Sequence, residues 1–353
     1  EILKTTTTRL ASCIKVGDLV ARLSADTFGL VLNGITQGDV AEQVAGRVLQ
    51  AIRQTYFAES VPIQLKASVG ITLFPNDGRD VPILLRQAEL AMGSAKSGGG
   101  NSCVFFDPVL AESAERRRQL ETDMRSALRN QEMVLFYQPV VDLQTHRLAG
   151  AEALIRWRHP ARGLVGPDNF VALAEQTGLI VDIGLFVLDA ACRQLRDWRQ
   201  AGLDYTLSFN VSGRQIPDGL PPAKLREVIH HYGIDPAKLA LEITEGVMLQ
   251  DIDKSLAWLQ AVHALGLRIH LDDFGTGYSS LSYLKRFPID TLKIDQSFVK
   301  DMQGTGNERT LVGAILAMAS SLGLEVVAEG VELPSHRQAL RAMGCHYAQG
   351  FLF

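Results

Sequence analysis

Carboxylate, amide and ammonium side chains stand at the ends of successive apolar runs in the later part of the sequence. In the stretch Arg268–Asp295, one apolar run ends in Asp272 and Asp273, and a second run ends with Lys293. Burying unpaired charges is costly, so this pattern favours a site built on the ends of buried strands. For the Asp272–Asp273 pair alone, capping of the next helix is the alternative. The pattern recurs with Glu152, Asn210, Glu242, Glu245, Glu329 and Gln349.

This set of side chains predicts a metal-dependent reaction at phosphorus. Oxygen ligands without His or Cys select hard divalent cations, Mg²⁺ or Mn²⁺. Asp272 and Asp273 are adjacent and are expected to point to different sides of the strand end, where they would serve two ions or bridge them. Two ions about 3.5–4 Å apart can generate a hydroxide and stabilise in-line displacement at phosphorus. Lys293 would orient the attacking water or stabilise phosphoryl charge, and Arg156 is a candidate phosphate clamp.

A second reaction class fits the same spacing. In an enolase-like barrel, Mg²⁺ and a Lys base such as Lys293 abstract a proton beside a carboxylate. We expect no second Lys or His opposite Lys293 to act as its partner, which counts against this alternative.

The elements that would position these residues are short β-rich runs alternating with amphipathic, helix-length segments. The predicted strands are Val134–Val141, Leu148–Arg156, Tyr205–Val211, Leu239–Thr244, Arg268–Asp273, Thr291–Asp295, Glu325–Gly330 and Tyr347–Phe353. Predicted helices between them include Ile183–Gln200, Met248–Ala264, Gly306–Leu322 and Leu333–Met343. Eight strands over roughly 220 residues predict an α/β fold, a modified TIM-like (β/α)₈ barrel whose strand ends meet at one mouth. The connection Asp142–His146 is too short for a helical crossover, so the first two strands are expected to be antiparallel.

The first hundred residues show a different, α+β pattern, which predicts helices packed on a mainly antiparallel sheet. The predicted strands are Asp18–Leu23 and Thr27–Leu32, which form a hairpin, then Gln64–Phe74 and Cys103–Phe106; the predicted helices are Asp39–Gln54 and Val81–Lys96. A long polar helix, Val109–Asn130, follows as a semi-rigid connector with a solvated basic triplet at Arg116–Arg118. The predicted domains are therefore residues 1–107, a connector at 108–130, and residues 131–353.

Composition narrows the class of protein and its partners. The net charge of −4 argues against binding to duplex nucleic acid. The four cysteines have no zinc-type spacing, so free thiols in a reducing compartment are expected. No transmembrane run or signal peptide is visible, so a cytoplasmic location is expected for these domains. The chain begins within a predicted helix and ends within an apolar run, as expected of an excerpt from a longer protein, so an upstream membrane or sensor segment stays open.

The first domain resembles the GGDEF family, which makes cyclic di-GMP from GTP. The resemblance lies in VARLSADTFGLVL at 20–32, ASVGITLFPNDG at 67–78 and LLRQAELAMGSAK at 84–96. The signature is altered. Where the family has Gly-Gly-Asp/Glu-Glu-Phe, this chain has Ser24-Ala25-Asp26-Thr27-Phe28, and where the family has the inhibitory Arg-x-x-Asp motif, it has Lys15-x-x-Asp18. Ser and Ala tolerate positive φ less readily than Gly, and Thr27 removes a carboxylate expected to bind Mg²⁺. We interpret this domain as partial, degenerate and catalytically inactive, with a regulatory or purely structural role and GTP as a candidate ligand.

From about Leu120 onward the chain resembles the EAL family of cyclic di-GMP phosphodiesterases. The matching segments are FYQPVVDL at 136–143, EALIRWRHP at 152–160, FNVSGRQ at 209–215, LEITE at 241–245, DDFGTGYSSLSYLK at 272–285, KID at 293–295, AEGVE at 328–332 and AQG at 348–350. The resemblance implies metal-dependent hydrolysis of cyclic di-GMP to linear pGpG at two Mg²⁺ or Mn²⁺ ions, inhibition by Ca²⁺, and a homodimer formed through this domain.

The resemblance also implies a role for each candidate site residue. Glu152, Asn210, Glu242 and Asp272 would hold one metal ion, Asp273 the second, and Glu329 would complete the shell. Lys293 would contact the attacking water, and Glu245 would anchor a loop at 275–280 that couples dimerisation and metal binding to activity. The residues expected to line the dinucleotide site are Gln138, Leu154, Arg156 and Gln349, with Asp295 and Glu332 on the guanine side or supporting the metal ligands. A receptor that binds cyclic di-GMP without hydrolysing it is the alternative, and the intact set of expected metal ligands counts against it.

Overall fold

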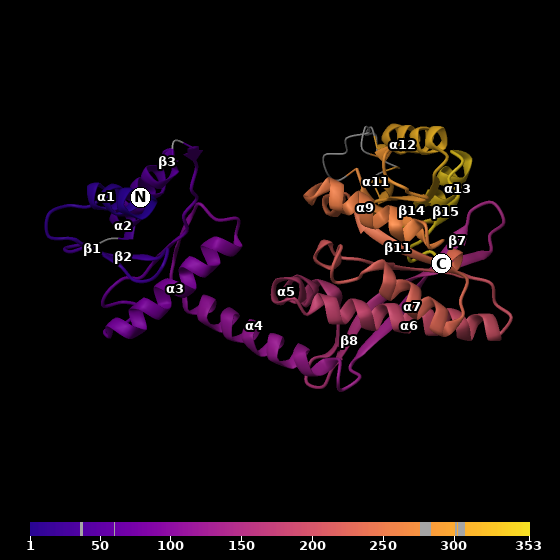
Figure 1. The fold of residues 1–353 in the computed structure, drawn as a ribbon, viewed down its shortest axis with the longest axis horizontal. Coiled ribbons are helices and arrows are strands. Elements are labelled where there is room, and N and C mark those ends of the chain that lie inside the picture. Colours follow the sequence, from indigo (N-terminus) through magenta and orange to yellow (C-terminus); the bar gives the residue numbers. More distant parts are fainter. Residues whose placement is uncertain (36–37, 60, 276–283, 301, 303–307) are drawn as a thin grey trace. The chain divides into compact units, whose positions relative to one another are not determined.

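The computed structural model describes residues 1–35, 38–59, 61–275, 284–300, 302 and 308–353. The chain divides into two compact units, Glu1–Gln119 and Leu120–Phe353 (Figure 1). Each unit has its own hydrophobic core, built from residues of that unit alone.

The first unit combines helices with three two-stranded sheets. Its helices are α1 (Ile2–Ser12), α2 (Gly38–Arg53) and α3 (Val81–Ser97). The sheets pair β1 (Leu19–Arg22) with β2 (Phe28–Val31), β3 (Tyr56–Ala58) with β4 (Val61–Ile63), and β5 (Val69–Ile71) with β6 (Cys103–Phe105). The β1–β2 hairpin is antiparallel, as predicted.

Two predictions for this unit are wrong. The described strands form three separate two-stranded sheets in place of one sheet; two of these pairings are antiparallel, and β5 and β6 pair in parallel. The predicted strand Gln64–Phe74 shortens to Val69–Ile71, because only these residues find a partner strand. Gly70 lies against α3, where a Cβ would overlap the backbone of Ala88. The glycine therefore permits a close approach of helix and strand that the apolar pattern did not reveal.

Helix α4 (Pro108–Ala127) spans the boundary between the units. Its first half is polar: Arg116 pairs with Glu112 on an exposed face, as a solvated connector should. Its second half is not. Leu120, Met124 and Ala127 repeat at helical spacing and are buried in the core of the second unit. The connector helix is therefore also part of the second unit's fold.

The second unit is a closed barrel of eight strands. They are β7 (Met133–Asp142), β8 (Leu148–His159), β10 (Thr206–Asn210), β11 (Leu239–Thr244), β12 (Arg268–Phe274), β13 (Thr291–Ile294), β14 (Glu325–Ala328) and β15 (Tyr347–Ala348). β7 is antiparallel to both of its neighbours, β8 and β15, and the pairings from β8 through β10 to β15 are parallel. The predicted modified barrel with an antiparallel first strand is confirmed. A short strand, β9 (Gly163–Val165), pairs antiparallel with the last residues of β8 and is not one of the eight barrel strands.

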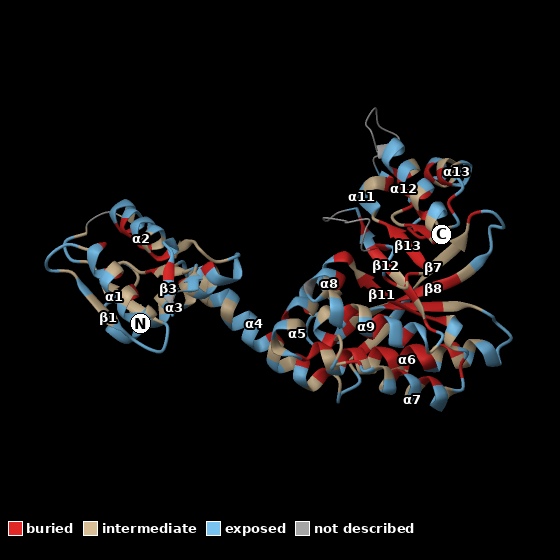
Figure 2. Cartoon of the chain, turned by 45° about the horizontal axis from the view of Figure 1, so that its top comes forward, coloured by how far each residue is buried: buried red, intermediate tan, exposed pale blue. Residues whose placement is uncertain are grey.

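Helices cover the barrel. They are α5 (Val171–Thr177), α6 (Ile180–Gln200), α7 (Pro222–Tyr232), α8 (Glu245–Gln250), α9 (Ile252–His263), α11 (Gln296–Lys300), α12 (Glu308–Leu322) and α13 (Pro334–Ala342), with 3₁₀ turns η1 (Pro167–Asn169), η2 (Gly213–Gln215) and η3 (Pro236–Lys238). Buried residues run along the strands and the inward faces of these helices (Figure 2). The predicted helix Met248–Ala264 is in fact two, because Asp251 adopts an extended conformation and caps α9 through the backbone N–H of Lys254.

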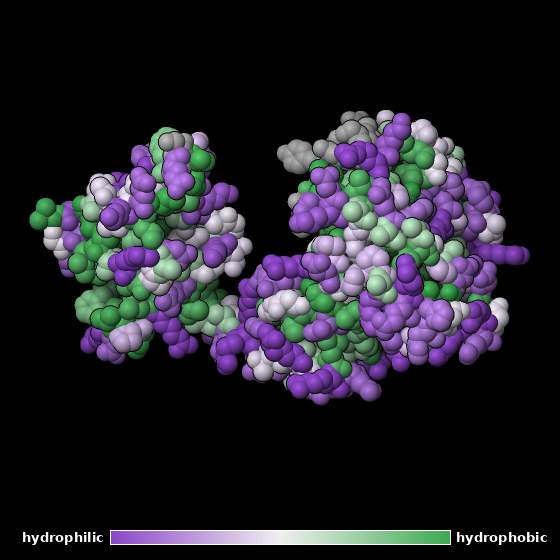
Figure 3. All heavy atoms as spheres, viewed as in Figure 1, coloured by the Kyte–Doolittle hydropathy of each residue, from purple (hydrophilic) through white to green (hydrophobic). Residues whose placement is uncertain are grey.

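The surface of the second unit carries mixed polarity. On the face seen in Figure 3, hydrophilic residues predominate and hydrophobic residues gather in smaller patches. Within the described part of the chain, no helix combines the length and apolar character needed to span a membrane.

Candidate active site

Lys293 lies at the centre of a cluster of carboxylates inside the barrel. It is carried by β13, a strand buried along its whole length. Its Nζ lies 3.1 Å from Oε2 of Glu152, 2.6 Å from Oε2 of Glu242, 3.2 Å from Oδ1 of Asp272 and 2.8 Å from Oε1 of Glu329. These carboxylates come from β8, β11, β12 and the residue after β14, so four separate strands converge on one ammonium group. A helix cap alone would not account for the contact of Asp272 with Lys293, so this alternative is insufficient.

Two amide side chains hold the carboxylates in place. Gln349 follows β15 directly and donates through Nε2 to Oε2 of Glu152 at 2.9 Å and to Oε1 of Glu329 at 2.8 Å. Asn210, at the end of β10, donates through Nδ2 to Oε1 of Glu152 at 2.7 Å. Burial opposes ionisation of Glu152, but Lys293 and these amides outweigh it, so the net effect lowers the pKa of Glu152. The anionic form of Glu152 is therefore favoured within the cluster.

Two other carboxyl groups are held near their neutral forms. Burial, the largest cause, and neighbouring carboxylates together raise the pKa of Glu242 to about 8. Burial likewise raises the pKa of Glu329 to about 8, with Asp272 and Glu152 adding to the effect. One ammonium group cannot compensate so many acids at this distance. The site has an excess of negative charge when all its acids ionise.

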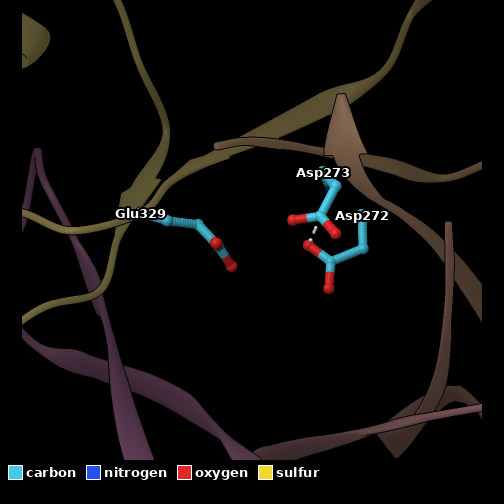
Figure 4. Close-up of side chains that lie close together, drawn as sticks. All are labelled: Asp272, Asp273 and Glu329. Carbon is cyan, nitrogen blue, oxygen red and sulfur yellow. Dashed lines mark hydrogen bonds between the residues drawn. The ribbon is translucent and has the colours of Figure 1, made fainter. Parts of the chain in front are cut away.

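Asp273 completes a group of three acids that could hold a metal ion. Carboxylate oxygens of Asp272, Asp273 and Glu329 lie within 4.8 Å of one another (Figure 4). Counted with Glu152 and Glu242, five carboxylates face one Lys293, which leaves four negative charges that two divalent cations would balance. The donors are oxygens, as hard cations prefer. In addition, Oε1 of Gln349 is buried and has no hydrogen-bond partner among the described residues, so a further group can donate to it. The residues present fit divalent metal binding.

The backbone of Asp273 explains how adjacent acids come to share one space. Asp273 has φ of +55°, and the pairing of β12 with β13 shifts register between Leu271 and Phe274. A bulge of this kind re-aims a side chain, so the two carboxylates point toward the same region and face Glu329 (Figure 4). The prediction that Asp272 and Asp273 point to different sides is wrong, because it assumed a regular strand. The backbone N–H of Asp273 also donates to Oδ1 of Asp272 at 3.0 Å.

His270 was missed by the sequence reasoning. It lies on β12 with its Nδ1 3.5 Å from Oε1 of Glu242. The signal was available, because His270 stands two residues before Asp272 and therefore on the same face of the strand. Burial, assisted by the charge of Lys293, lowers the pKa of His270 to about 3. The imidazole is thus neutral and a weak base, so it does not supply the partner that the enolase-like alternative requires.

Glu245 begins α8, immediately after β11. Its Oε1 accepts a hydrogen bond from the backbone N–H of Gly275 at 3.1 Å, at the start of the segment that it was predicted to anchor. The rest of that segment, residues 276–280, lies outside the described residues. The contact places Glu245 close to the group of three acids, since Gly275 is two residues from Asp273.

The predicted substrate residues Gln138, Leu154 and Arg156 lie on the β7–β8 hairpin. Gln138 is directly opposite Glu152 in the ladder. Leu154 and Arg156 follow Glu152 at two-residue intervals, so all four share one face. β10 pairs with β8 only as far as Ala153, so Leu154 and Arg156 extend beyond the barrel at its carboxyl end.

Asp295 and Glu332 have local partners. Asp295 accepts from the backbone N–H of Ser297 at 3.0 Å, at the start of α11. It also lies close enough to raise the pKa of Asp273, although burial and Asp272 contribute more. Glu332 lies 3.6 Å from Nζ of Lys300. The structure thus places Asp295 near Asp273 in the group of three acids and leaves Glu332 in a peripheral ion pair.

The altered signature of the first unit is held by contacts within its hairpin. The guanidinium of Arg22 donates to the carbonyls of Ser24 at 3.0 Å and Ala25 at 2.7 Å. Asp18 accepts from the backbone N–H groups of Asn33 at 2.8 Å and Lys15 at 3.1 Å. The Asn33 contact is the main reason that the pKa of Asp18 is lowered. Asp18 therefore closes the base of the hairpin.

Comparison with known proteins places both units. The EAL domain family matches residues 121–353, and the diguanylate cyclase GGDEF domain family matches residues 1–102. The bifunctional diguanylate cyclase/cyclic di-GMP phosphodiesterase MucR of Pseudomonas aeruginosa is 39% identical over 98% of this chain and 50% of its own length. The cyclic di-GMP phosphodiesterase NbdA of the same species is 38% identical over the full chain and 45% of its own length. The chain thus spans about half the length of the curated relatives it matches.

A solved structure agrees with these matches. The PaMucR phosphodiesterase in complex with c-di-GMP is similar with a TM-score of 0.64 and 43% identity, over 66% of this chain and 95% of that one. The predicted order of the two domains is confirmed. With two thirds of its length matched by one family, the chain belongs to the EAL domain family, and a GGDEF domain precedes its EAL domain.

Proposed function

We propose that the EAL domain hydrolyses one phosphodiester bond of cyclic di-GMP and releases linear pGpG. The observation that carries the proposal is the convergence of four carboxylates on Lys293 at the carboxyl ends of barrel strands. Barrel enzymes place their chemistry at this end. The relatives MucR and NbdA are both named as cyclic di-GMP phosphodiesterases, which supports this substrate.

The residues proposed to hold two divalent cations, Mg²⁺ or Mn²⁺, are Glu152, Asn210, Glu242, Asp272, Asp273 and Glu329. Ions bound there would supply Lewis acidity toward a phosphoryl oxygen and lower the pKa of water. The excess negative charge of the cluster supports this assignment, because the acids repel one another until cations compensate them. Ca²⁺ prefers more ligands and a looser geometry, so we propose that it binds without supporting turnover.

The chain's own side chains supply the remaining functions. Lys293 would hold the attacking water by a charge-assisted hydrogen bond and stabilise charge on phosphorus-bound oxygen. Arg156 would bind a phosphate of the substrate, and Gln138 and Leu154 would contact the dinucleotide beside it. Gln349 would keep Glu152 and Glu329 oriented while its Oε1 accepts from a bound group. Glu245 would fix the start of the segment after β12.

The GGDEF domain is proposed to be inactive as a cyclase and to act as a regulatory or structural unit. Thr27 replaces an acidic residue of the signature, and Asp18 and Arg22 are engaged in holding the hairpin. GTP remains a candidate regulatory ligand of this domain, and a homodimer formed through the EAL domain is the proposed assembly.

A receptor that binds cyclic di-GMP without turnover is the second candidate. The intact set of oxygen donors around Lys293 favours the enzyme, because a receptor has no need of metal ligands. The test strips the whole chain of metal, then adds Mg²⁺, Mn²⁺ or Ca²⁺, and measures cyclic di-GMP binding and pGpG release in parallel. If the chain is an enzyme, it should release pGpG with Mg²⁺ or Mn²⁺. This release should be lost in Glu152→Ala and Lys293→Ala. Binding of cyclic di-GMP without release of pGpG, whichever metal is added, would show that the chain is a receptor.

A further inference from the structure

Phe136 is an exposed aromatic residue on the same face as the proposed substrate residues, and the sequence reasoning assigned it no role. It lies on β7 directly opposite Leu154, two residues from Gln138. Phe136 is 42% exposed and lies outside the hydrophobic core of the unit. Its neighbour Tyr137 points to the opposite face and packs against Trp198 with ring centroids 5.7 Å apart. The two neighbouring rings therefore lie on opposite faces of β7, and only that of Phe136 lies on the face of Leu154 and Arg156.

The part of the hairpin that carries Phe136 projects beyond the barrel. We call residues 133–136 and 154–159 the β7–β8 arm, since β10 pairs with β8 only as far as Ala153. The back of the arm is firmly packed. Trp157 is fully buried, contacts Phe170 with ring centroids 5.9 Å apart, and donates to Oε2 of Glu132 at 2.9 Å. The arm is thus a rigid support whose front face carries Phe136, Leu154 and Arg156.

Arg156 lies beside the exposed ring. Its guanidinium carbon is 5.9 Å from the centroid of Phe136. In the described part of the chain, no carboxylate forms an ion pair with Arg156, whose hydrogen bond goes to the adjacent carbonyl of Ile155 at 2.8 Å. The front face of the arm therefore presents a flat apolar ring next to a cation that is available to an anion. A purine base linked to a phosphate has the matching chemistry, because bases stack on aromatic rings and guanidinium binds phosphate.

We propose that Phe136 is a substrate-binding residue that stacks with one base of the substrate while Arg156 binds the adjoining phosphate. This inference rests on the proposed function, because it takes cyclic di-GMP as the substrate. Phe136 lies on the arm and outside the carboxylate cluster, so its ring adds binding free energy without touching the reacting phosphorus. Stacking is made equally in the ground state and the transition state, so its loss raises KM and leaves kcat nearly unchanged.

The experiment measures kcat and KM for cyclic di-GMP in the whole chain with Mg²⁺ for Phe136→Ala, Phe136→Leu and Phe136→Trp. Base stacking predicts that KM rises between ~5-fold and ~150-fold in Phe136→Ala, with kcat within about twofold of wild type. Phe136→Leu keeps an apolar strand residue of similar size and should show most of the same loss. Phe136→Trp should restore the KM of the wild-type chain. Leu148→Ala is the matched control, because Leu148 is 41% exposed at the other end of β8.

A spectroscopic signal separates stacking from a structural role. The probe is a cyclic dinucleotide with 2-aminopurine in place of one guanine, whose fluorescence is quenched on stacking, mixed with the chain in Ca²⁺ to suppress turnover. Quenching should persist in Phe136→Trp and Leu148→Ala and be lost in Phe136→Leu. An unchanged KM in both Phe136→Ala and Phe136→Leu, or an effect confined to kcat, overturns this inference. If the wild-type chain still turns over cyclic di-GMP in that experiment, the proposed function is not affected. Absence of turnover in the wild-type chain instead contradicts the proposed function.

Discussion

Nζ of Lys293 lies 2.6 Å from Oε2 of Glu242, and both side chains are almost wholly buried. Burial disfavours the charged form of Lys293, but the four surrounding carboxylates outweigh it and raise the pKa of Lys293 well above its ordinary range. The ammonium group is therefore the fixed positive charge around which the acids of the site are arranged. Removing it should affect the fold as well as the reaction.

Lys293→Met should destabilise the metal-free EAL domain by about 3 kcal/mol or more, because it leaves buried carboxylates without their cation. Added Mg²⁺ should recover part of the loss in stability, but pGpG release should stay abolished. Urea unfolding with EDTA or Mg²⁺ measures the first effect. Lys300→Met is the control. Lys300 pairs with Glu332 at 3.6 Å on the surface, so this substitution should lower the free energy of unfolding by less than about 1 kcal/mol. Equal losses in the two variants would contradict a central role for Lys293.

The stability of the metal-free chain should fall as pH rises from about 4.5 to about 8. Glu242 and Glu329 each have a pKa raised from 4.5 to about 8, chiefly by burial, so the folded chain binds more protons than the unfolded chain in this range. Their contribution to stability is complete below the unfolded value and is lost as pH passes the folded value. Metal binding needs the ionised carboxylates, so stabilisation by Mg²⁺ should grow over the same range.

Thermal unfolding at several pH values, with EDTA and with Mg²⁺, measures this dependence. Glu329→Gln removes one of the two acids and should flatten the fall of Tm in EDTA. A Tm in EDTA that rises between about pH 4.5 and about pH 8 would contradict raised pKa values for these carboxyl groups in the folded chain.

Asp273 combines an unusual backbone conformation with a proposed catalytic carboxylate, and two substitutions separate these properties. Its φ is +55°, a region that Asn tolerates and that β-branched residues strongly disfavour. Asp273→Asn should keep the stability of the chain within about 0.5 kcal/mol while lowering kcat at least ~100-fold. Asp273→Val should lose activity and also destabilise the fold by about 1–3 kcal/mol. Matching denaturation midpoints for the two variants would contradict the requirement for a positive φ.

The second half of α4 should stabilise the EAL domain through a buried contact. Nε2 of His159 lies 3.0 Å from Oδ2 of Asp123, while Nδ1 of His159 accepts from the backbone N–H of Ala161 at 3.1 Å. Asp123→Ala should therefore lower the free energy of unfolding of this domain by about 1–3 kcal/mol, because it leaves a buried imidazole N–H unpaired. Glu112→Ala, in an exposed pair on the same helix, should change it by less than about 1 kcal/mol. Differential scanning calorimetry distinguishes the two variants.

The sequence alone determined the barrel and the carboxylates and lysine of its site, although not His270 beside them. Apolar runs of strand length that end in charged residues predict strand ends gathered at one mouth, and Glu152, Glu242, Asp272, Lys293 and Glu329 do meet there. The short connection after β7 was enough to predict its antiparallel pairing with β8, because no helix fits within it. Such features are local in the chain, so a linear pattern carries them.

Only the tertiary structure decided how the side chains of the site are aimed and what they contact. A bulge between β12 and β13 turns Asp273 toward Asp272, although strict alternation would separate them. Met124 of the polar-looking helix α4 is buried because a neighbouring surface, invisible in that helix's own sequence, covers it. Phe136 is exposed because it lies opposite Leu154, where β8 continues past the last residue that pairs with β10. Each of these outcomes depends on strand register and on contacts between segments far apart in the chain, and spacing along the sequence does not specify either.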